Sequence, residues 1–460
     1  MEGTMSESSA PRFRVLMFPW LAHGHISPYL ELSKRLSENN FHICFCSTEI
    51  NLNFIKKSKT FDEISSIELV QLDLPDLPEL PPQHHTTRNL PLHLKSTLER
   101  AFYMGKANFQ NILSTLKPDL LIYDAPQSWI SELAALNHIP SVLFIIVAAV
   151  NLSFFYHAVN CGIDGTNEAY PFPAIYYRDY ETKKMIAMSQ ESKESLPEDA
   201  AFSPKCFELS SFVLVKSWRE IEGKYIDHFS FSCGKKVLAL NLLNVQDDDT
   251  KEEENNSHIM KFLNGKDESS VIYLSFGSEY YLSKEEREEI AHGLELSNAN
   301  FIWVLRFPVG DSIALEEALP EGFLERVKER GIVVDGWAPQ AKILEHPSTG
   351  GFLSHCGWGS VTESMYFGVP LLALPMFYDQ FLQARLAEDI GVGIEILRGE
   401  NGQTNREEVA KAIKMVALEN EVGELLREKA RELSNQMRGG GEGVLHEAIK
   451  KLKDLCSKNK

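Results

Sequence analysis

Two histidines stand one residue apart near the beginning of the chain, in the stretch FPWLAHGHISPYLEL that covers residues 18–32. A neutral imidazole is well suited to take a proton from a hydroxyl group near neutral pH. One apolar run ends at Phe18, and another, DLLIYD, ends at Asp124. Because parallel strands end at one edge of a sheet, Asp124 could fix the tautomer of a histidine there. The pattern predicts a His–Asp pair that activates a hydroxyl, and it leaves His23 and His25 open as the base.

A second group of polar side chains lies in WAPQAKILEHPSTGGFLSHCGWGSVTESMYFGVPLLALPMFYDQ, residues 337–380. At its centre an apolar run ends at His355, and a glycine-rich turn leads into a helical pattern that begins near Ser360. A helix N-terminus after such a turn offers free backbone N–H groups and a positive dipole, which suit a phosphate. Hydrogen bonds from His355 and Ser360 would add to this capacity. The segment therefore predicts an anion site.

Other residues of the same segment fit the remaining parts of a nucleotide-linked sugar. Glu363 lies about one turn into the predicted helix, where its carboxylate could accept hydrogen bonds from ribose hydroxyls. Trp337 offers a flat face for a base, and Asp379 and Gln380 follow another apolar run with groups that bind sugar hydroxyls. Each of these residue types is common at such a position, but their combined order along the chain indicates a site for a nucleotide-linked sugar.

The elements that position these residues are predicted by short apolar runs that alternate with amphipathic runs, as in βαβ units. RVLMFPW, SVLFII and KVLAL predict strands in the first half, and Ser27 and Pro28 predict the N-cap and first position of a helix to about Ser37. The acidic stretch QDDDTKEEENNS interrupts the pattern, which restarts with SVIYLSFGS and NFIWVLR. We expect two doubly wound α/β domains with a cleft at the carboxyl ends of their strands.

Composition excludes several classes of function. The net charge of −19 argues against a nucleic acid or an anionic membrane surface as partner, because both require clustered Lys and Arg. The most apolar window, residues 139–150, is shorter than the ~20 residues of a membrane span, and we expect no signal peptide. Seven cysteines without metal-ligand spacing indicate a reducing compartment, so we expect a cytoplasmic protein.

Three local motifs receive ordinary explanations. The aspartates at 247–249 belong to a charge run, and a solvated linker explains them better than a metal site. Cys356 is attributed to a buried position rather than to a nucleophile. The glycosylation sequon at Asn151 is attributed to chance.

The segment at 337–380 closely resembles the signature box of the plant family 1 UDP-dependent glycosyltransferases, without a gap. FPWLAHGHISP resembles the N-terminal segment of this family, and YLSFGS resembles its phosphate loop, so the resemblance extends over nearly the whole chain. LPPQHHTTRNLP and EIEGKY resemble the branch that adds a sugar to a sugar already attached to a terpenoid or flavonoid. The resemblance implies a GT-B fold, in which two facing Rossmann-like domains have parallel sheets and a cleft between them.

The domain boundaries follow from the pattern and this resemblance together. We expect an acceptor-binding domain at residues 12–245, an acidic linker at 246–257 and a UDP-sugar-binding domain at 258–440. A C-terminal helix within 441–460 is expected to pack back on the first domain.

The resemblance also implies a role for each donor-site residue. Uracil and ribose would be held by Trp337, the Ala338 backbone, Gln340 and Glu363. The diphosphate would be held by Ser278, His355 and Ser360, and the sugar by Trp358, Asp379 and Gln380. Gln380 in the last position implies glucose as the donor sugar. Gly359 stands where the family commonly has an asparagine amide, so the diphosphate would depend more on the other groups. A second departure, at 237–245, has no functional explanation.

Alignment on the Gly-His…Pro pattern of the family selects His25 as the general base and Asp124 as its partner, and leaves His23 as a loop or acceptor-pocket residue. We expect an inverting displacement by a hydroxyl of a small-molecule glycoside, without a metal ion or other cofactor. The alternatives are the same chemistry on a bare aglycone, or a non-catalytic protein that binds a UDP-sugar. We expect a monomer without an integral membrane segment.

Overall fold

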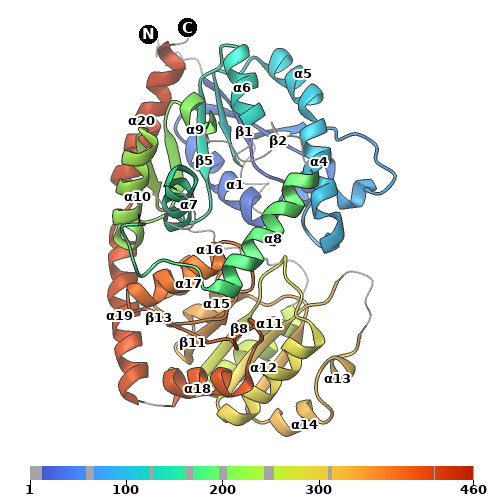
Figure 1. Cartoon of the computed structure of the whole chain (residues 1–460), viewed down its shortest axis with the longest axis vertical. Helices are drawn as coiled ribbons and strands as arrows, with labels where there is room; N and C mark the ends of the chain where they lie inside the picture. Colours follow the sequence, from blue (N-terminus) through green and yellow to red (C-terminus); the bar gives the residue numbers. More distant parts are fainter. Residues whose placement is uncertain are drawn as a thin grey trace, which may run out of the picture.

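The computed structural model describes residues 13–57, 67–124, 128–161, 169–195, 205–242, 253–308, 313–418 and 420–458. Two α/β domains lie one above the other along the long axis of the molecule (Figure 1). Each contains one sheet in which all the paired strands are parallel, and the two sheets carry the strand orders β3-β2-β1-β4-β5-β6-β7 and β10-β9-β8-β11-β12-β13. The predicted GT-B arrangement of two Rossmann-like domains is confirmed.

The first domain carries the predicted strands in the predicted order, with one edge strand in addition. Its strands are β1 (Phe13–Phe18), β2 (Phe41–Ser47), β3 (Ile67–Gln71), β4 (Leu120–Tyr123), β5 (Ser141–Ile145), β6 (Val213–Lys216) and β7 (Val237–Leu240). Its helices are α1 (His23–Ser37), α2 (Glu49–Lys57), α4 (Lys95–Met104), α5 (Lys106–Leu116), α6 (Ser128–Leu136), α7 (Ala149–Cys161), α8 (Asp179–Ser195), α9 (Lys205–Leu209) and α10 (Arg219–Cys233), with 3₁₀ turns at Pro82–His84 and Leu92–Leu94.

The second domain repeats this construction around a smaller sheet. Its strands are β8 (Val271–Ser275), β9 (Asn300–Leu305), β10 (Gly331–Asp335), β11 (Thr349–Ser354), β12 (Leu371–Ala373) and β13 (Gly393–Glu395). The helices of this half are α11 (Glu253–Asn264), α12 (Lys284–Ser297), α13 (Leu315–Ala318), α14 (Phe323–Val327), α15 (Gln340–Glu345), α16 (Trp358–Phe367), α17 (Gln380–Asp389), α18 (Arg406–Ala417), α19 (Asn420–Gly439) and α20 (Glu442–Lys458).

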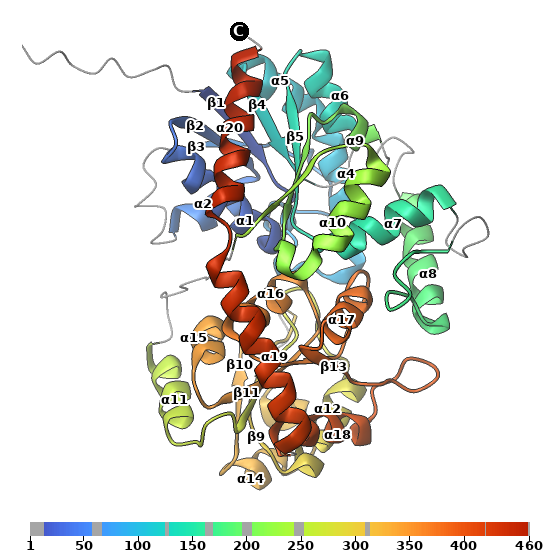
Figure 2. The same cartoon turned by 90° about the vertical axis from the view of Figure 1, so that its left-hand side faces the viewer.

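Both faces of the first sheet are covered by apolar side chains, as expected for a parallel sheet. Alternate residues of β1 enter two different cores, with Leu16 in one and Val15 in the other. Leu452 and Cys456 of α20 join the second of these cores. The C-terminal helix thus returns from the second domain to cover the first (Figure 2). No helix within the described ranges is long and apolar enough to cross a membrane.

The predicted start of the first helix is wrong. The N-cap is Ala22 rather than Ser27, and the Ala22 carbonyl accepts hydrogen bonds from the backbone N–H groups of His25 and Ile26. Pro28 therefore lies inside the helix, where it removes one backbone hydrogen bond. We attribute the earlier start to burial of Ile26 and to the side-chain contact of His25 described below. As a result, His25 lies in the first turn of α1.

Residues 246–252 of the predicted linker at 246–257 lie outside the described ranges. Helix α11 begins at Glu253, inside that predicted linker. The unusual segment at 237–245 begins as the ordinary strand β7, and its last three residues also lie outside the described ranges.

Helix α8, which the sequence left unassigned, crosses from the first domain to the second (Figure 1). Glu181 of α8 is fully buried and pairs with the buried Arg385 of α17 at 2.8 Å. Arg178, directly before the helix, makes two hydrogen bonds with Glu395 at 2.6 and 3.0 Å. These four charges compensate one another, which is the condition under which charges can be buried at an interface.

Replacement of Glu181 by alanine is expected to lower the free energy of unfolding by ~3–5 kcal/mol, because the buried Arg385 would keep only its longer contact with Glu395, at 3.5 Å. Urea unfolding followed by circular dichroism measures this change. The matched control is Glu31→Ala, which breaks an exposed i,i+4 pair with Arg35 and should cost less than ~1 kcal/mol. Equal effects of the two variants would contradict this account of α8.

Candidate active site

The pair predicted from the two separated motifs is present at the carboxyl edge of the first sheet. His25 in the first turn of α1 lies with its Nδ1 2.5 Å from Oδ2 of Asp124, the residue that follows β4. The same carboxylate oxygen accepts the backbone N–H of Trp20 at 3.2 Å, and the backbone N–H of Asp124 donates to the Phe18 carbonyl. Asp124 is 4% exposed and His25 24% exposed, so the aspartate is buried while the imidazole remains partly accessible.

Opposing effects set the proton affinity of His25. Burial lowers its pKa, but the charge and hydrogen bond of Asp124, together with the carboxylates of Glu279 and Asp379, leave that pKa raised above its ordinary value. Glu279 and Asp379 belong to the second domain, so charged groups of both domains determine the pKa of His25.

The other candidates of this region lie apart from the pair. The ring of His23 packs edge-on against Phe54 of α2, with centroids 4.9 Å apart. Asp119, at the start of the run that ends in Asp124, accepts the backbone N–H of Arg14 at the opposite edge of the sheet. The structure therefore joins Asp124 to His25 rather than to His23.

In the second domain, two glycines hold the ring of His355 in place. A Cβ atom placed on Gly277, after β8, or on Gly357, before α16, would each lie 2.6 Å from a ring atom of His355. Nδ1 of His355 is buried and has no hydrogen-bond partner among the described residues. Burial lowers the pKa of His355 to about 4, although a hydrogen bond with the Ser275 backbone opposes this effect, so the ring is neutral at neutral pH. A neutral imidazole has one donor and one acceptor nitrogen, so a ring held in this place can also bind a polar ligand.

The start of α16 is also suited to an anion. Its N-cap, Gly357, provides no side-chain cap, so the first-turn N–H groups are not satisfied by a capping side chain. The helix begins at Trp358, two residues earlier than the sequence predicted. Ser278 lies in the turn next to Gly277, which brings the YLSFGS loop to the same place. The two loops predicted to hold a diphosphate are thus adjacent.

A polar network extends from the start of α16 to the residues that are predicted to bind ribose and uracil. Gln340 donates a hydrogen bond to the Glu363 carboxylate at 2.7 Å, and its amide lies 3.5 Å from the Ser360 hydroxyl. Burial raises the pKa of Glu363, and the Gln340 hydrogen bond opposes that rise. Trp337 lies with its ring centroid 5.9 Å from the guanidinium of Arg306, and Ala338 next to it is buried.

The predicted sugar end of the site lies where the two domains meet. Asp379 accepts hydrogen bonds from Gln383 at 2.7 Å and from Asn151 of α7 at 3.0 Å. Burial raises the pKa of Asp379, which the nearby His25 opposes. Gln380 is 5% exposed, and its Oε1 accepts the backbone N–H of Met376.

Sequence reasoning missed the contacts that residues distant in the sequence make around this site. Asn151 was noticed only as a sequon, but it is 1% exposed and holds Asp379. The Arg306 guanidinium donates hydrogen bonds to the Gly277 carbonyl and to the side-chain oxygen of Asn89. Trp358 was predicted for the sugar site, but its contact with the first domain was not: its indole N–H donates to the Lys216 carbonyl at 2.7 Å. No local pattern marks such residues, because their partners are far away in the sequence.

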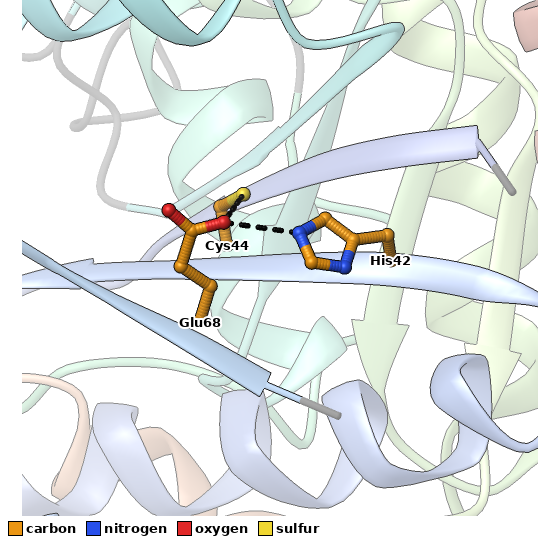
Figure 3. Close-up of side chains that lie close together, drawn as sticks. All are labelled: His42, Cys44 and Glu68. Carbon is orange, nitrogen blue, oxygen red and sulfur yellow. Dashed lines mark hydrogen bonds and ion pairs between the residues drawn. The ribbon is translucent and has the colours of Figure 1, made fainter. Parts of the chain in front are cut away.

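A separate polar cluster lies on β2 and β3, away from the carboxyl edge. The Glu68 carboxylate lies 3.0 Å from Nε2 of His42 and accepts a hydrogen bond from the Cys44 thiol at 3.6 Å (Figure 3). Burial raises the pKa of the Cys44 thiol to about 12, and the nearby Arg14 guanidinium opposes a bound cation. Hydrogen bonding explains this cluster without a metal ion.

Two family models match the two halves of the chain. Residues 12–244 match "Glycosyltransferase, N-terminal domain", and residues 228–434 match "UDP-glucoronosyl and UDP-glucosyl transferase". The chain is 47% identical to beta-D-glucosyl crocetin beta-1,6-glucosyltransferase of Gardenia jasminoides, with 96% of this chain and 98% of that protein covered. It is 44% identical to flavanone 7-O-glucoside 2''-O-beta-L-rhamnosyltransferase of Citrus maxima, with 97% and 98% covered.

A solved structure has the same fold. UGT73P12 of Glycyrrhiza uralensis, complexed with glycyrrhetinic acid 3-O-monoglucuronide, superposes with a TM-score of 0.79 at 24% identity, with 97% of each chain covered. The chain therefore belongs to the plant family 1 UDP-dependent glycosyltransferases. It is a UDP-glycosyltransferase, as the sequence resemblance implied.

Replacement of Gly277 or Gly357 by alanine is expected to push the His355 ring out of place and weaken UDP binding by ~10-fold or more, because the added methyl group would overlap the ring. Isothermal titration calorimetry with UDP measures the affinity. Gly223→Ala on α10 is the control, since only one side-chain atom of Arg219 lies within 4 Å of its added Cβ. Unchanged UDP binding in both loop variants would exclude His355 from the donor site.

Proposed function

We propose that this enzyme transfers glucose from UDP-glucose to a hydroxyl of a sugar already attached to a terpenoid or flavonoid, with inversion at the anomeric carbon. The observation that carries the proposal is the His25–Asp124 pair, which faces Asp379 of the predicted sugar site across the cleft. The two relatives named above act, by their names, on a glucosylated crocetin and a flavanone glucoside, which supports a glycoside as acceptor.

The reaction is a single displacement. The acceptor hydroxyl gives its proton to Nε2 of His25 while its oxygen forms the bond to the anomeric carbon, and the bond from that carbon to the UDP oxygen breaks. Asp124 holds Nδ1 and stabilises the imidazolium that forms. The departing diphosphate is stabilised by the N-terminus of α16, by His355 and by Ser360. An α-linked donor therefore gives a β-linked product, and this scheme calls for no metal ion.

Donor recognition follows the layout of the second domain. Trp337, Ala338, Gln340 and Glu363 bind the nucleoside in this proposal. Asp379 and Gln380 bind the hydroxyls of the sugar. The choice of glucose rests on Gln380, and a comparison of UDP-glucose with UDP-rhamnose, UDP-xylose and UDP-glucuronate tests it. A cytoplasmic, monomeric enzyme stays a prediction.

Asp124→Asn is expected to lower kcat by ~10²–10⁴-fold, because the imidazole loses its charged partner. The base works as neutral imidazole, so kcat/KM falls as the pH drops through the pKa of His25, which Asp124 raises. Burial persists in the variant while the carboxylate is lost, so the acid limb should move to lower pH. A pH–rate profile measures both effects.

His25→Ala should stop transfer and leave UDP binding intact, whereas His23→Ala should keep the rate within a few-fold. An acid limb that stays in place in Asp124→Asn, or full activity in His25→Ala, would refute the assignment of the base.

The acceptor class is tested by the turnover of a terpenoid or flavonoid monoglucoside against that of its aglycone, with UDP-glucose as donor. We expect kcat/KM to favour the monoglucoside by ~10-fold or more, because a second ring of hydroxyls adds hydrogen bonds in the cleft. Product mass spectrometry identifies the added hexose. Preference for the aglycone would instead support the bare-aglycone reaction.

A further inference from the structure

A buried lysine without a counter-ion in contact lies where the two domains meet. Lys216 is the last residue of β6, at the carboxyl edge of the first sheet, and it is 4% exposed. Among the residues that the structure describes, its ammonium has no hydrogen-bond or ion-pair partner. An uncompensated buried charge is costly, so a lysine of this kind is expected where an anionic ligand binds.

The surroundings of Lys216 belong to the donor site. Its backbone carbonyl accepts the indole N–H of Trp358, the first residue of α16, at 2.7 Å. Burial lowers the pKa of Lys216 to about 8, and the carboxylate of Glu363, which like Trp358 belongs to α16, partly opposes this effect. The end of β6 therefore lies against the N-terminal part of α16, the helix that carries Glu363 of the predicted ribose site and begins at the predicted diphosphate site.

The second domain leaves room at this place. Gly359, next to Trp358, is exposed, and a Cβ atom built on it would meet nothing within 4 Å. Here the chain lacks the asparagine amide that the family commonly presents to the phosphate. A cation matches a diphosphate better than it matches neutral ribose hydroxyls, since charge-assisted hydrogen bonds are the stronger ones.

We propose that the ammonium of Lys216 binds the diphosphate of the UDP-sugar from the first domain and supplies the contact that Gly359 cannot make. This inference rests on the proposed donor site. It makes closure of the two domains part of donor binding, because the anion is held by α16 on one side and by β6 on the other.

The test is calorimetric titration of the full chain with UDP and with uridine, which lacks the phosphates. Lys216→Met removes the charge and keeps most of the packing. We expect its Kd for UDP to rise ~10- to 100-fold, while its Kd for uridine stays within ~2-fold of the wild-type value. Lys216→Arg should retain most of the UDP affinity, because it keeps the positive charge.

The matched control is Lys224→Met. Lys224 also belongs to the first domain and pairs across the same boundary with Asp389 at 2.7 Å, but its side chain is 49% exposed. Its replacement should leave both Kd values within ~2-fold, because exposed pairs contribute little. A second rescue is Gly359→Asn in the Lys216→Met background, which should recover part of the UDP affinity by restoring an amide at the phosphate.

Distinct results would overturn the inference. Equal loss of UDP and uridine affinity in Lys216→Met would mean that the lysine acts through Glu363 and the ribose, and no loss would remove it from the site. If Lys216→Met lowers the melting temperature, Lys216→Gln, which is also neutral, gives the same comparison. A wild-type chain that fails to bind UDP would defeat the proposed function itself, whereas wild-type binding with an unchanged variant defeats this inference alone.

Discussion

The proposed chemistry depends on one geometric constraint, which is that the carboxyl edges of two separate parallel sheets face each other. Strand ends of the first sheet supply His25 and Asp124, and strand ends of the second supply the loops around His355 and Asp379. Neither sheet carries both the proposed base and the proposed donor site. The contacts that set their separation, such as Trp358 to Lys216, are therefore as important as the reactive groups.

This constraint places ionisable groups in surroundings where their charge depends on what binds. Burial raises the pKa of Asp379 and of Glu363, and it lowers the pKa of His355 to about 4. In the proposed reaction, a bound UDP-sugar would replace the water that such groups lose on burial.

Much of this arrangement could be predicted from sequence, because the information is local. Apolar runs predicted most of the strands, and the two strands that were missed, β3 and β13, lie at the edges of their sheets. In β3 only Ile67 is buried, so no apolar run marks it. The donor box and the Gly-His…Pro pattern predicted the candidate site residues, and the structure brings His25 and Asp124 of these into contact. The start of α1 was misplaced because Ser27 and Pro28 are strong local signals that tertiary contacts override.

What sequence could not predict are contacts between residues far apart in the chain. Helix α8 has no sustained apolar stripe, and its position is set by ion pairs with Arg385 and Glu395 of the other domain. Asn151 carries a misleading sequon, yet its amide holds Asp379. Such residues acquire a role only when two sheets are brought together, so a pattern within one segment gives no sign of them.

The proton affinity of His25, the proposed base, is set by groups of both domains. A base must be neutral before it reacts and must hold a proton afterwards, so its pKa should lie near the working pH. Burial alone would lower the pKa and weaken the base, and Asp124 corrects this from the first domain. Glu279 and Asp379 add to the correction from the second domain. Because Glu279 and Asp379 belong to the second domain, the proton affinity of the proposed base depends on how that domain lies against the first.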